Sequence, residues 1–444
     1  MELKDNIWNE LDRIRGAIPI EKMIPAVIRI TFVKFAADNY LFSETKEDMR
    51  IYANIHKSIA NKDINAFVEN SVPLFEMIDK KISANGILYE AAIRLENDLI
   101  NPLYAKKGYS SETSHRLFDL LCALNLDEGT TDNSVISNHL ERFIYECSVR
   151  SGKYGGEYYS SRSINALVKK LLNVGDSDTY HDFACGCGLS DMSITDGKGI
   201  IQNLSDANEE MVQLAIMLHI IWGYDMDKIH FAVSDVFEHV SDKEHYSKIF
   251  SDFPFGIKLN KSLKGYGDGT VYAIHKMIDE LDVNGIAVIT CPSSILSRTD
   301  RETTELRFEL LTNKLLKSVI TLPPVMIGTL VNVNLLILSK EKNESVLLVD
   351  ASKNDVTQFS NNSKKASSEL TQEGIDQICR IVKTNDEIHG ISKVISAECL
   401  LKKNSISPQL YVEQVDLNEL PSQQEIAGQL DDLYKALMES LKNR

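Results

Sequence analysis

The chain has 444 residues, of which 43% are hydrophobic and 25% are charged, and its formal net charge at pH 7 is −16. These proportions are typical of a globular protein, and the length allows two or three domains. The acidic balance argues against a stand-alone DNA-binding protein, but it permits an enzyme that acts on DNA beside a basic partner.

The sequence carries no pattern typical of membrane insertion or secretion. No apolar run approaches the roughly 20 residues that a membrane helix needs. The charged start, Met1–Asp5, does not resemble a signal peptide, so we expect a cytoplasmic protein without a membrane partner. The seven scattered cysteines suggest reduced thiols. Cys185 and Cys187 lack a second pair at the spacing of a zinc site, so no metal is expected.

Residues 1–150 are predicted to form an N-terminal helical domain. Glycine and proline are sparse there, and Ile24–Phe35 is a long apolar stretch. Further helical patterns run through Ile64–Ile82, Ile87–Leu99, Ser114–Leu124 and Val135–Val149. We expect a helical bundle with no chemistry of its own. The glycine-rich break at Gly152–Gly156 is the predicted domain boundary.

Residues 151–352 alternate between strand and helix patterns, which predicts an α/β domain. Strands are expected at Thr179–Phe183, Ile200–Leu204, Ile229–Val233, Lys248–Asp252, Ile286–Thr290, Leu316–Thr321, Val333–Leu338 and Val346–Val349. Helices are expected at Ile164–Leu172, Glu209–Trp222, Thr270–Leu281 and Thr303–Asn313. The alternation favours a mostly parallel sheet covered on both faces. In such sheets ligands bind at the carboxyl ends of the strands.

Residues 353–444 form a C-terminal extension in this interpretation. A polar segment, Asn361–Lys365, precedes short helices expected at Gln372–Thr384 and Ser396–Leu401. Pro421–Arg444 is typical of an amphipathic helix, because leucines and an isoleucine repeat at intervals of three and four. Such a helix packs either on its own domain or on a partner helix, and the pattern does not distinguish the two.

The stretch Tyr180–Gly188 is the first candidate site. It is a predicted strand that runs into a turn with two glycines, where backbone N–H groups could approach a ligand. An incidental Gly-x-Gly at a strand end is the more frequent explanation of such a match when it stands alone. The motif therefore gains weight only from companion residues at fixed distances downstream.

Two acidic residues come after the next two strands. Asp206 lies at about the twenty-residue offset at which dinucleotide folds place a carboxylate that accepts hydrogen bonds from ribose hydroxyls. It also suits a role at the N-terminus of the next helix, and the two roles are compatible. Asp235 ends the third strand, where a carboxylate could accept from an adenine amino group, although a loop aspartate is an equal alternative.

The fourth strand ends in Ser251–Gly256, whose residues suit a planar base that carries an exocyclic amine. Asp252 and the carbonyl of Phe253 could accept the two amine hydrogens, while Phe255 stacks on the ring. Aligning the nitrogen lone pair with an electrophilic methyl group is chiefly a matter of positioning. The alternative without a function is an apolar turn. The four candidate sites each lie at the carboxyl end of a strand, and their order along the chain matches the order of the ligand's parts, which favours the functional interpretation.

This order of motifs resembles the S-adenosylmethionine-dependent amino methyltransferases that act on DNA, above all the modification subunit of type I restriction–modification systems. The likeness covers nearly the whole chain. Trp8–Gly16 is similar to the family's W-x3-D-x-L-R-G, and Gly156–Arg162 resembles its G-[EQ]-[YF]-[YF]-T-P-R. Asp182–Gly188 stands where D-P-A-C-G-S-G is expected, and Asp252–Phe255 where N-P-P-[FY] is expected. Later segments similar to x-I-x-L-P-P, D-A-S and S-P-x-x-Y-V are Ser318–Pro324, Val349–Ser352 and Ser407–Val412.

The resemblance implies a Rossmann-like methyltransferase sheet with an N-terminal all-helical domain and a C-terminal helical tail. It implies that S-adenosylmethionine binds over Glu157, Tyr158, Tyr159, Ser160, Asp182, Ala184, Gly186 and Gly188, with Asp206 on its ribose and Asp235 on its adenine. The catalytic group would be Asp252, Phe253, Pro254 and Phe255, acting on N6 of an adenine flipped out of the duplex. DNA and a specificity subunit are the implied partners. Whether a second copy of the chain and a nuclease subunit join them stays open.

Several departures from the family pattern point to a divergent or weakened enzyme. Ser161, Phe183 and Phe253 each stand where the family has proline, and Asp252 replaces the usual asparagine. An aspartate occurs there in related adenine methyltransferases with D-P-P-Y, but Phe253 loses the fixed φ of proline. The alternatives are therefore an inactive subunit with a structural or defence role, or an enzyme whose substrate is cytosine N4 or a glutamine amide.

Overall fold

The computed structural model describes residues 20–100, 111–127, 133–151, 160–197, 199–238, 245–260, 265–326, 331–353, 359–361 and 368–412. Four sequence predictions lie outside these residues. They are the segment similar to W-x3-D-x-L-R-G, the domain boundary at Gly152–Gly156, the cofactor residues Glu157, Tyr158 and Tyr159, and the helix expected at Pro421–Arg444. Within the described part, no helix combines the length and the apolar character that crossing a membrane would need.

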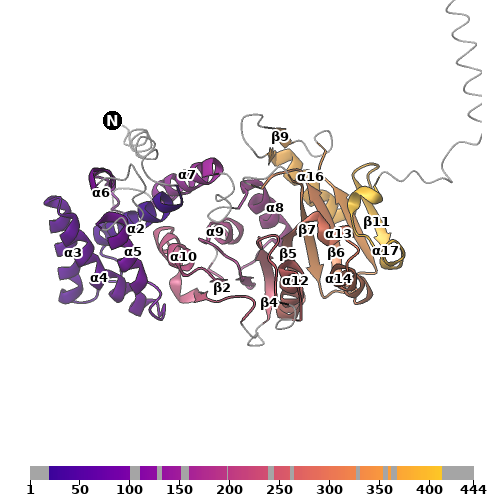
Figure 1. Cartoon of the computed structure of the whole chain (residues 1–444), viewed down its shortest axis with the longest axis horizontal. Coiled ribbons are helices and arrows are strands. Elements are labelled where there is room, and N and C mark those ends of the chain that lie inside the picture. Colours follow the sequence, from indigo (N-terminus) through magenta and orange to yellow (C-terminus); the bar gives the residue numbers. More distant parts are fainter. Residues whose placement is uncertain are drawn as a thin grey trace, which may run out of the picture.

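The N-terminal region is helical, as predicted. Its helices are α2 (Ile20–Asn39), α3 (Lys46–Ala60), α4 (Ile64–Lys81), α5 (Tyr89–Leu99), α6 (Ser111–Cys122) and α7 (Asn133–Ser151). They form one end of the elongated molecule (Figure 1). Almost every residue of α2 from Met23 to Ala37 is buried, because its neighbours α3, α5, α6 and α7 pack around it. Such a helix, apolar on nearly all sides, belongs in a core.

A nine-stranded sheet forms the centre of the molecule (Figure 1). Its strands are β1 (Thr179–Asp182), β2 (Ile201–Asp206), β3 (Ile229–Val233), β4 (Tyr246–Ser251), β5 (Leu281–Cys291), β6 (Leu316–Leu322), β7 (Val333–Ser339), β8 (Ser345–Asp350) and β11 (Ser392–Ser396). They lie in the order β11-β8-β6-β7-β5-β4-β1-β2-β3. The predicted parallel pairing is confirmed for β1 to β5, whereas β7 and β11 run antiparallel to their neighbours.

Helices cover the two faces and divide the core in two. One face carries α8 (Arg162–Leu172), α9 (Leu189–Thr195), α10 (Glu209–Ile221) and α16 (Gln372–Thr384), and their buried residues join the core of the N-terminal helices. The other face carries α12 (Gly269–Glu280), α13 (Ser293–Ser297), α14 (Arg301–Thr312) and α17 (Ala397–Lys403). The expected cover on both faces is incomplete, because a groove opens on β1, β2 and β3.

The N-terminal helices are joined to the sheet domain through α10. Helix α2 packs on α10, and the fully buried Arg29 of α2 forms ion pairs with Asp98 of α5 and Glu210 of α10. A buried guanidinium is costly unless it is paired and hydrogen-bonded. Because Glu210 lies in the first turn of α10, this ion triad anchors the helix that follows the predicted ribose-binding residue Asp206.

Candidate functional site

The chain order of the strands creates a crevice at the carboxyl ends of β1 and β4. β2 and β3 extend the sheet on one side of β1, and β4 and β5 extend it on the other. The chain leaves β1 and β4 toward opposite sides of the sheet. In open α/β sheets this change of side leaves a crevice at the carboxyl ends of the two strands, where ligands bind. All four predicted motif segments begin at this edge of the sheet.

The loop between β1 and α9 is shaped by its two glycines. Gly186 and Gly188 have positive φ, 54° and 79°, which side chains with a Cβ rarely adopt. The loop is tied to β2 by two hydrogen bonds, from the Cys185 N–H to the Ser205 carbonyl (3.0 Å) and from the Gly186 N–H to Asp206 Oδ2 (3.0 Å). Gly188 also lies against the buried His219, so close that a Cβ there would be 2.6 Å from the ring.

Asp206 therefore has a structural role alongside its predicted one. Its Oδ1 accepts the Asn208 N–H at 2.8 Å, while its Oδ2 accepts the Gly186 N–H. Burial raises the pKa of Asp206 from its usual value, against these two hydrogen bonds. Each carboxylate oxygen has a second lone pair, so both keep the capacity to accept a further hydrogen bond from a ligand.

Asp252 follows β4 and is held from two sides. The Thr290 hydroxyl, near the end of β5, donates to Asp252 Oδ1 at 2.6 Å, and the Ser160 side chain is hydrogen-bonded to the same carboxyl group. Burial raises the pKa of Asp252, against these two hydrogen bonds. Thr290 is completely buried. The sequence pattern did not single it out, because only the pairing of β4 with β5 brings it to Asp252.

Seven of the predicted residues line one cavity of about 200 Å³, whereas Gly188, Phe253 and Phe255 are not part of its lining. Its lining includes Ser160, Asp182, Ala184, Gly186, Asp206, Asp252 and Pro254. Phe255 follows the lining residue Pro254 in the chain and has 37% of its surface exposed, so its ring is accessible to a stacking partner. The described lining contains three carboxyl groups and neither lysine nor arginine. This composition disfavours a phosphate ligand and suits a positively charged one.

Asp235 lies apart from this lining. It follows β3, and its Oδ1 accepts the Phe237 N–H at 2.9 Å, which fixes a tight turn. Among the described residues, the cavity lining does not include it. Its role on the adenine of a cofactor stays a prediction, and so do the roles of Glu157, Tyr158 and Tyr159.

Two of the departures from the family pattern contact each other. Phe183 and Phe253, which both stand in place of proline, have ring centroids 6.2 Å apart, and Phe237 packs on Phe253 at 5.8 Å. Phe183 and Phe253 are each only 3% exposed. Aromatic pairs of this kind add ring–ring attraction to the area that they bury. The Phe253 side chain is therefore fixed by packing, whereas a proline would fix the backbone φ through its ring.

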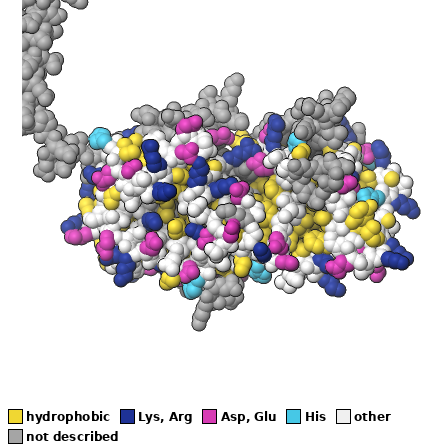
Figure 2. All heavy atoms as spheres, turned by 180° about the vertical axis from the view of Figure 1, so that it is seen from behind, with side chains coloured by type: hydrophobic (Ala, Val, Ile, Leu, Met, Phe, Trp, Pro, Cys, Tyr) yellow, Lys and Arg dark blue, Asp and Glu magenta, His cyan; other side chains and the backbone are white. Residues whose placement is uncertain are grey.

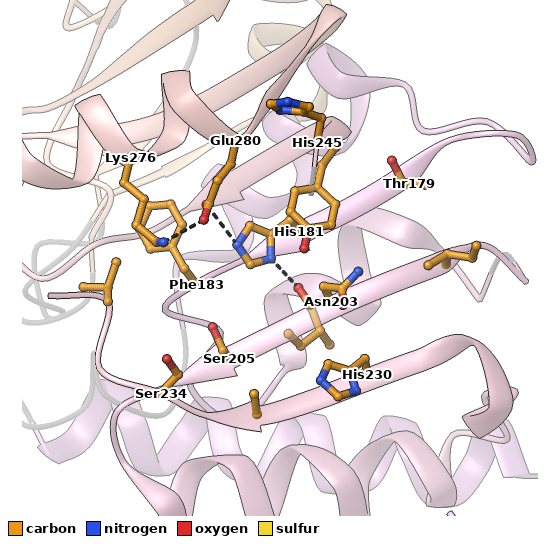
Figure 3. A pocket seen from close by; sticks show the side chains of 15 residues that line it. Thr179, His181, Phe183, Asn203, Ser205, His230, Ser234, His245, Lys276 and Glu280 are labelled. Atoms are coloured by element: carbon orange, nitrogen blue, oxygen red, sulfur yellow. Dashed lines mark hydrogen bonds and ion pairs between the residues drawn. The ribbon is translucent and has the colours of Figure 1, made fainter. Parts of the chain in front are cut away.

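A larger cavity of about 630 Å³ opens on the opposite face of β1, β2 and β3 (Figure 3). An ion network lies at its wall. His181 of β1 donates from Nδ1 to the Asn203 carbonyl (2.7 Å), and its Nε2 lies 3.4 Å from Glu280 of α12. Lys276 donates to Glu280 at 2.6 Å. The network joins α12 to β1, and the groove shares none of the acidic residues of the smaller cavity.

Removing the centre of this network is expected to destabilise the fold. Glu280→Ala leaves Lys276 and His181 buried without their carboxylate, and we expect the free energy of unfolding to fall by about 3–5 kcal/mol. Glu280→Gln keeps the volume and one acceptor and should lose less. Urea denaturation at neutral pH measures both. A loss below about 1 kcal/mol for the alanine variant would contradict the assigned network.

The pH dependence of this effect results from the pKa of Glu280. Burial alone would raise it, but His181 and Lys276 outweigh burial and lower it below the usual 4.5. The network's stabilisation is therefore present above the pKa of the unfolded chain, and it is lost as the pH falls through the lower folded pKa. The difference between wild type and Glu280→Gln should shrink in acid.

Comparison with known proteins agrees with this fold. A family model described as N-6 DNA Methylase matches residues 131–419. The type I restriction-modification system methyltransferase subunit from Streptococcus thermophilus is 17% identical, with a TM-score of 0.72 over 93% of this chain and 99% of that one. A chain solved in work on complex assembly and conformational transition of the type I R-M system is 13% identical, with a TM-score of 0.67 over 100% of this chain and 98% of that one. At these identities the structures show a common fold.

Proposed function

The chain belongs to the N-6 DNA methylase family, and from this premise we propose that it transfers a methyl group from S-adenosylmethionine to N6 of adenine in DNA. One observation carries the proposal. The glycine loop after β1, Asp206 at the end of β2 and Asp252 after β4 line a single cavity, and the exposed ring of Phe255 follows in the chain. This is the arrangement that a methyl donor next to a flipped base requires.

The residues of the cavity suit this cofactor. S-adenosylmethionine carries a sulfonium and, when bound, supplies an electrophilic methyl group. The described lining has three carboxyl groups and no basic residue, so it holds acceptors for such a cation and no positive charge that would repel it. The free lone pairs of Asp206 are acceptors for the ribose hydroxyls.

The chain's own residues would position the target amine. Asp252 accepts one amine hydrogen, the Phe253 carbonyl accepts the other, and Phe255 stacks on the base. Thr290 and Ser160 keep the Asp252 carboxyl in one orientation. Packing of Phe253 against Phe183 and Phe237 fixes its side chain, which supports retained activity in place of the expected weakening.

DNA contacts would depend on a partner subunit. The net charge is −16, and acidic and basic side chains are interspersed over the face shown in Figure 2. A protein that binds DNA alone usually presents a basic surface. A specificity subunit, as in type I systems, would read the recognition sequence and supply phosphate contacts. The C-terminal helix expected at Pro421–Arg444 is our proposed docking element for it.

Transfer of a labelled methyl group tests this function. The chain is mixed with labelled S-adenosylmethionine, plasmid DNA and a type I specificity subunit. We expect label in DNA only when all components are present. Label in protein would indicate an amide substrate. Saturable cofactor binding without any methyl transfer would favour the alternative that the sequence leaves open, an inactive subunit with a structural or defence role.

A further inference from the structure

Two carboxyl groups, those of Asp182 and Asp191, lie at the two ends of the loop between β1 and α9. Asp191 has no role in the proposed reaction. Asp182, at the end of β1, is 2% exposed, and its Oδ1 accepts the Ala184 N–H at 2.8 Å. Asp191, in α9, is completely buried, and its Oδ1 accepts the Tyr180 hydroxyl at 2.7 Å. The carboxyl groups of Asp182 and Asp191 are close enough to interact, and each affects the pKa of the other.

This contact requires a proton. Two ionised carboxylates are both acceptors, and without a proton Asp191 Oδ2 is a buried oxygen with no donor among the described residues. A proton on Asp182 satisfies Asp191 Oδ2 and removes one of two like charges from the interior. Burial, and then the charge of Asp191, raise the pKa of Asp182 well above its usual range. The pair therefore carries one proton and one negative charge when Asp191 is ionised.

We propose that Asp191 is a positioning residue of the cofactor site, which shares one proton with Asp182 and so places a single negative charge under the pocket that favours the cationic methyl donor over its product. The product, S-adenosylhomocysteine, keeps the α-ammonium group but has a neutral sulfur, so this charge discriminates between the two ligands through the sulfonium that only the donor carries. The inference rests on the proposed function. Its consequence is a site that retains the donor and releases the product.

The charge of the pair changes near neutral pH. Burial raises the pKa of Asp191 to about 7, against the hydrogen bond from Tyr180 and the interaction with Asp182. Above that pH the pair has one negative charge, and below it the pair is neutral. Donor affinity should therefore rise with pH through this range, while product affinity changes little.

Other titratable groups around the pair do not explain such a change. On β1 and in the loop, burial raises the pKa values of Tyr180, Cys185 and Cys187, so all three stay neutral. On α10, burial lowers the pKa of His219 to about 4, so its ring is neutral as well. Burial also raises the pKa of Tyr224, which lies just after α10.

Two carboxyl groups on neighbouring strands complete these surroundings. They are Asp206 and Asp252, and burial raises the pKa of each. On α8, Lys169 is paired with Asp196 at the far end of α9. Asp252→Asn tests whether the carboxyl group of Asp252 causes the pH dependence of the donor's affinity. If Asp191 causes it, the asparagine variant should keep this pH dependence.

Calorimetric titration with S-adenosylmethionine and with S-adenosylhomocysteine tests the proposal without requiring turnover. From about pH 6 to about pH 8 we expect the donor's affinity to rise about tenfold and the product's less than twofold. Asp191→Asn should abolish this difference. Tyr180→Phe removes the hydroxyl that stabilises ionised Asp191, so it should move the midpoint to higher pH, which a purely structural role would not do.

The matched control is Asp196→Asn at the other end of α9. Asp196 has φ 57°, which asparagine tolerates, and it is paired with Lys169 away from the pocket. It should behave as wild type. Equal pH dependence for donor and product, or an unchanged preference in Asp191→Asn with a native melting curve, would overturn the proposal. Failure of both ligands to bind the wild type would instead count against the proposed function.

Discussion

Asp252→Ala is expected to lower the single-turnover rate of methyl transfer by about 10²–10³-fold, with less than a tenfold change in cofactor affinity. The variant loses the acceptor that orients the amine, and the cavity keeps Asp182 and Asp206. Quenched-flow transfer to DNA and calorimetry measure the two quantities separately. A rate within threefold of wild type would show that Asp252 does not orient the amine.

Asp252→Asn is the informative companion to this variant. The amide oxygen still accepts a hydrogen bond, so most of the rate should return. In the wild type the protonated carboxyl is a poorer acceptor, and burial raises its pKa, so activity should fall in acid at a higher pH than for an ordinary aspartate. The asparagine variant should lack this acid limb. Thr290→Val should cost about tenfold through loss of its hydrogen bond, while Thr290→Ser should not.

Gly188→Ala is expected to destabilise the fold and to weaken cofactor binding by at least tenfold. A Cβ at this residue would lie 2.6 Å from the His219 ring, which is fully buried and held by a hydrogen bond from its Nδ1 to the Ala215 carbonyl (2.7 Å). The positive φ adds about 1–2 kcal/mol of strain, and the clash adds about 1–3 kcal/mol. Chemical denaturation and calorimetry give the two effects.

Gly197 provides the matched control for this prediction. Its φ is also positive, 69°, but a Cβ there would have no neighbour within 4 Å. Gly197→Ala should therefore show the backbone strain without the clash and should leave cofactor binding unchanged. In a Gly188→Ala/His219→Ala double variant, part of the loss should be recovered. If the two glycine variants were equally stable, contact with His219 would not be the reason for glycine at 188.

Much of the fold could be predicted because its strands and helices have strong local patterns. The strand at Ile229–Val233 and the helix at Gln372–Thr384 are confirmed at both ends. The short segment between β1 and β2 has room for about two helical turns, and α9 has seven residues. Pairing direction has no local signature, so the antiparallel β7 and the edge strand β11 were not foreseen. Helix α3 was also missed, although Thr45 and Asp48 form a capping box.

Site residues could be predicted where they belong to a short motif at the end of a strand. They could not be predicted where their role depends on a contact with a residue far away in the sequence. Asp182, Asp206 and Asp252 were identified from their places after strands, and they line one cavity. Asp191 lies nine residues after Asp182 on a helix and Thr290 lies on β5, so neither had a signal of its own. Phe183 and Phe253, which stand in place of prolines, each suggested a weakened enzyme. The sequence does not show that their side chains pack together.

The identity of the methylated base tests the central claim most directly. DNA is incubated with the chain, its specificity subunit and S-adenosylmethionine, then digested to nucleosides and analysed by mass spectrometry, with Asp252→Ala in parallel. We expect N6-methyl-2′-deoxyadenosine from the wild type and a loss of about 10²-fold or more in the variant. N4-methyl-2′-deoxycytidine as the product, or equal yields from both proteins, would contradict the account.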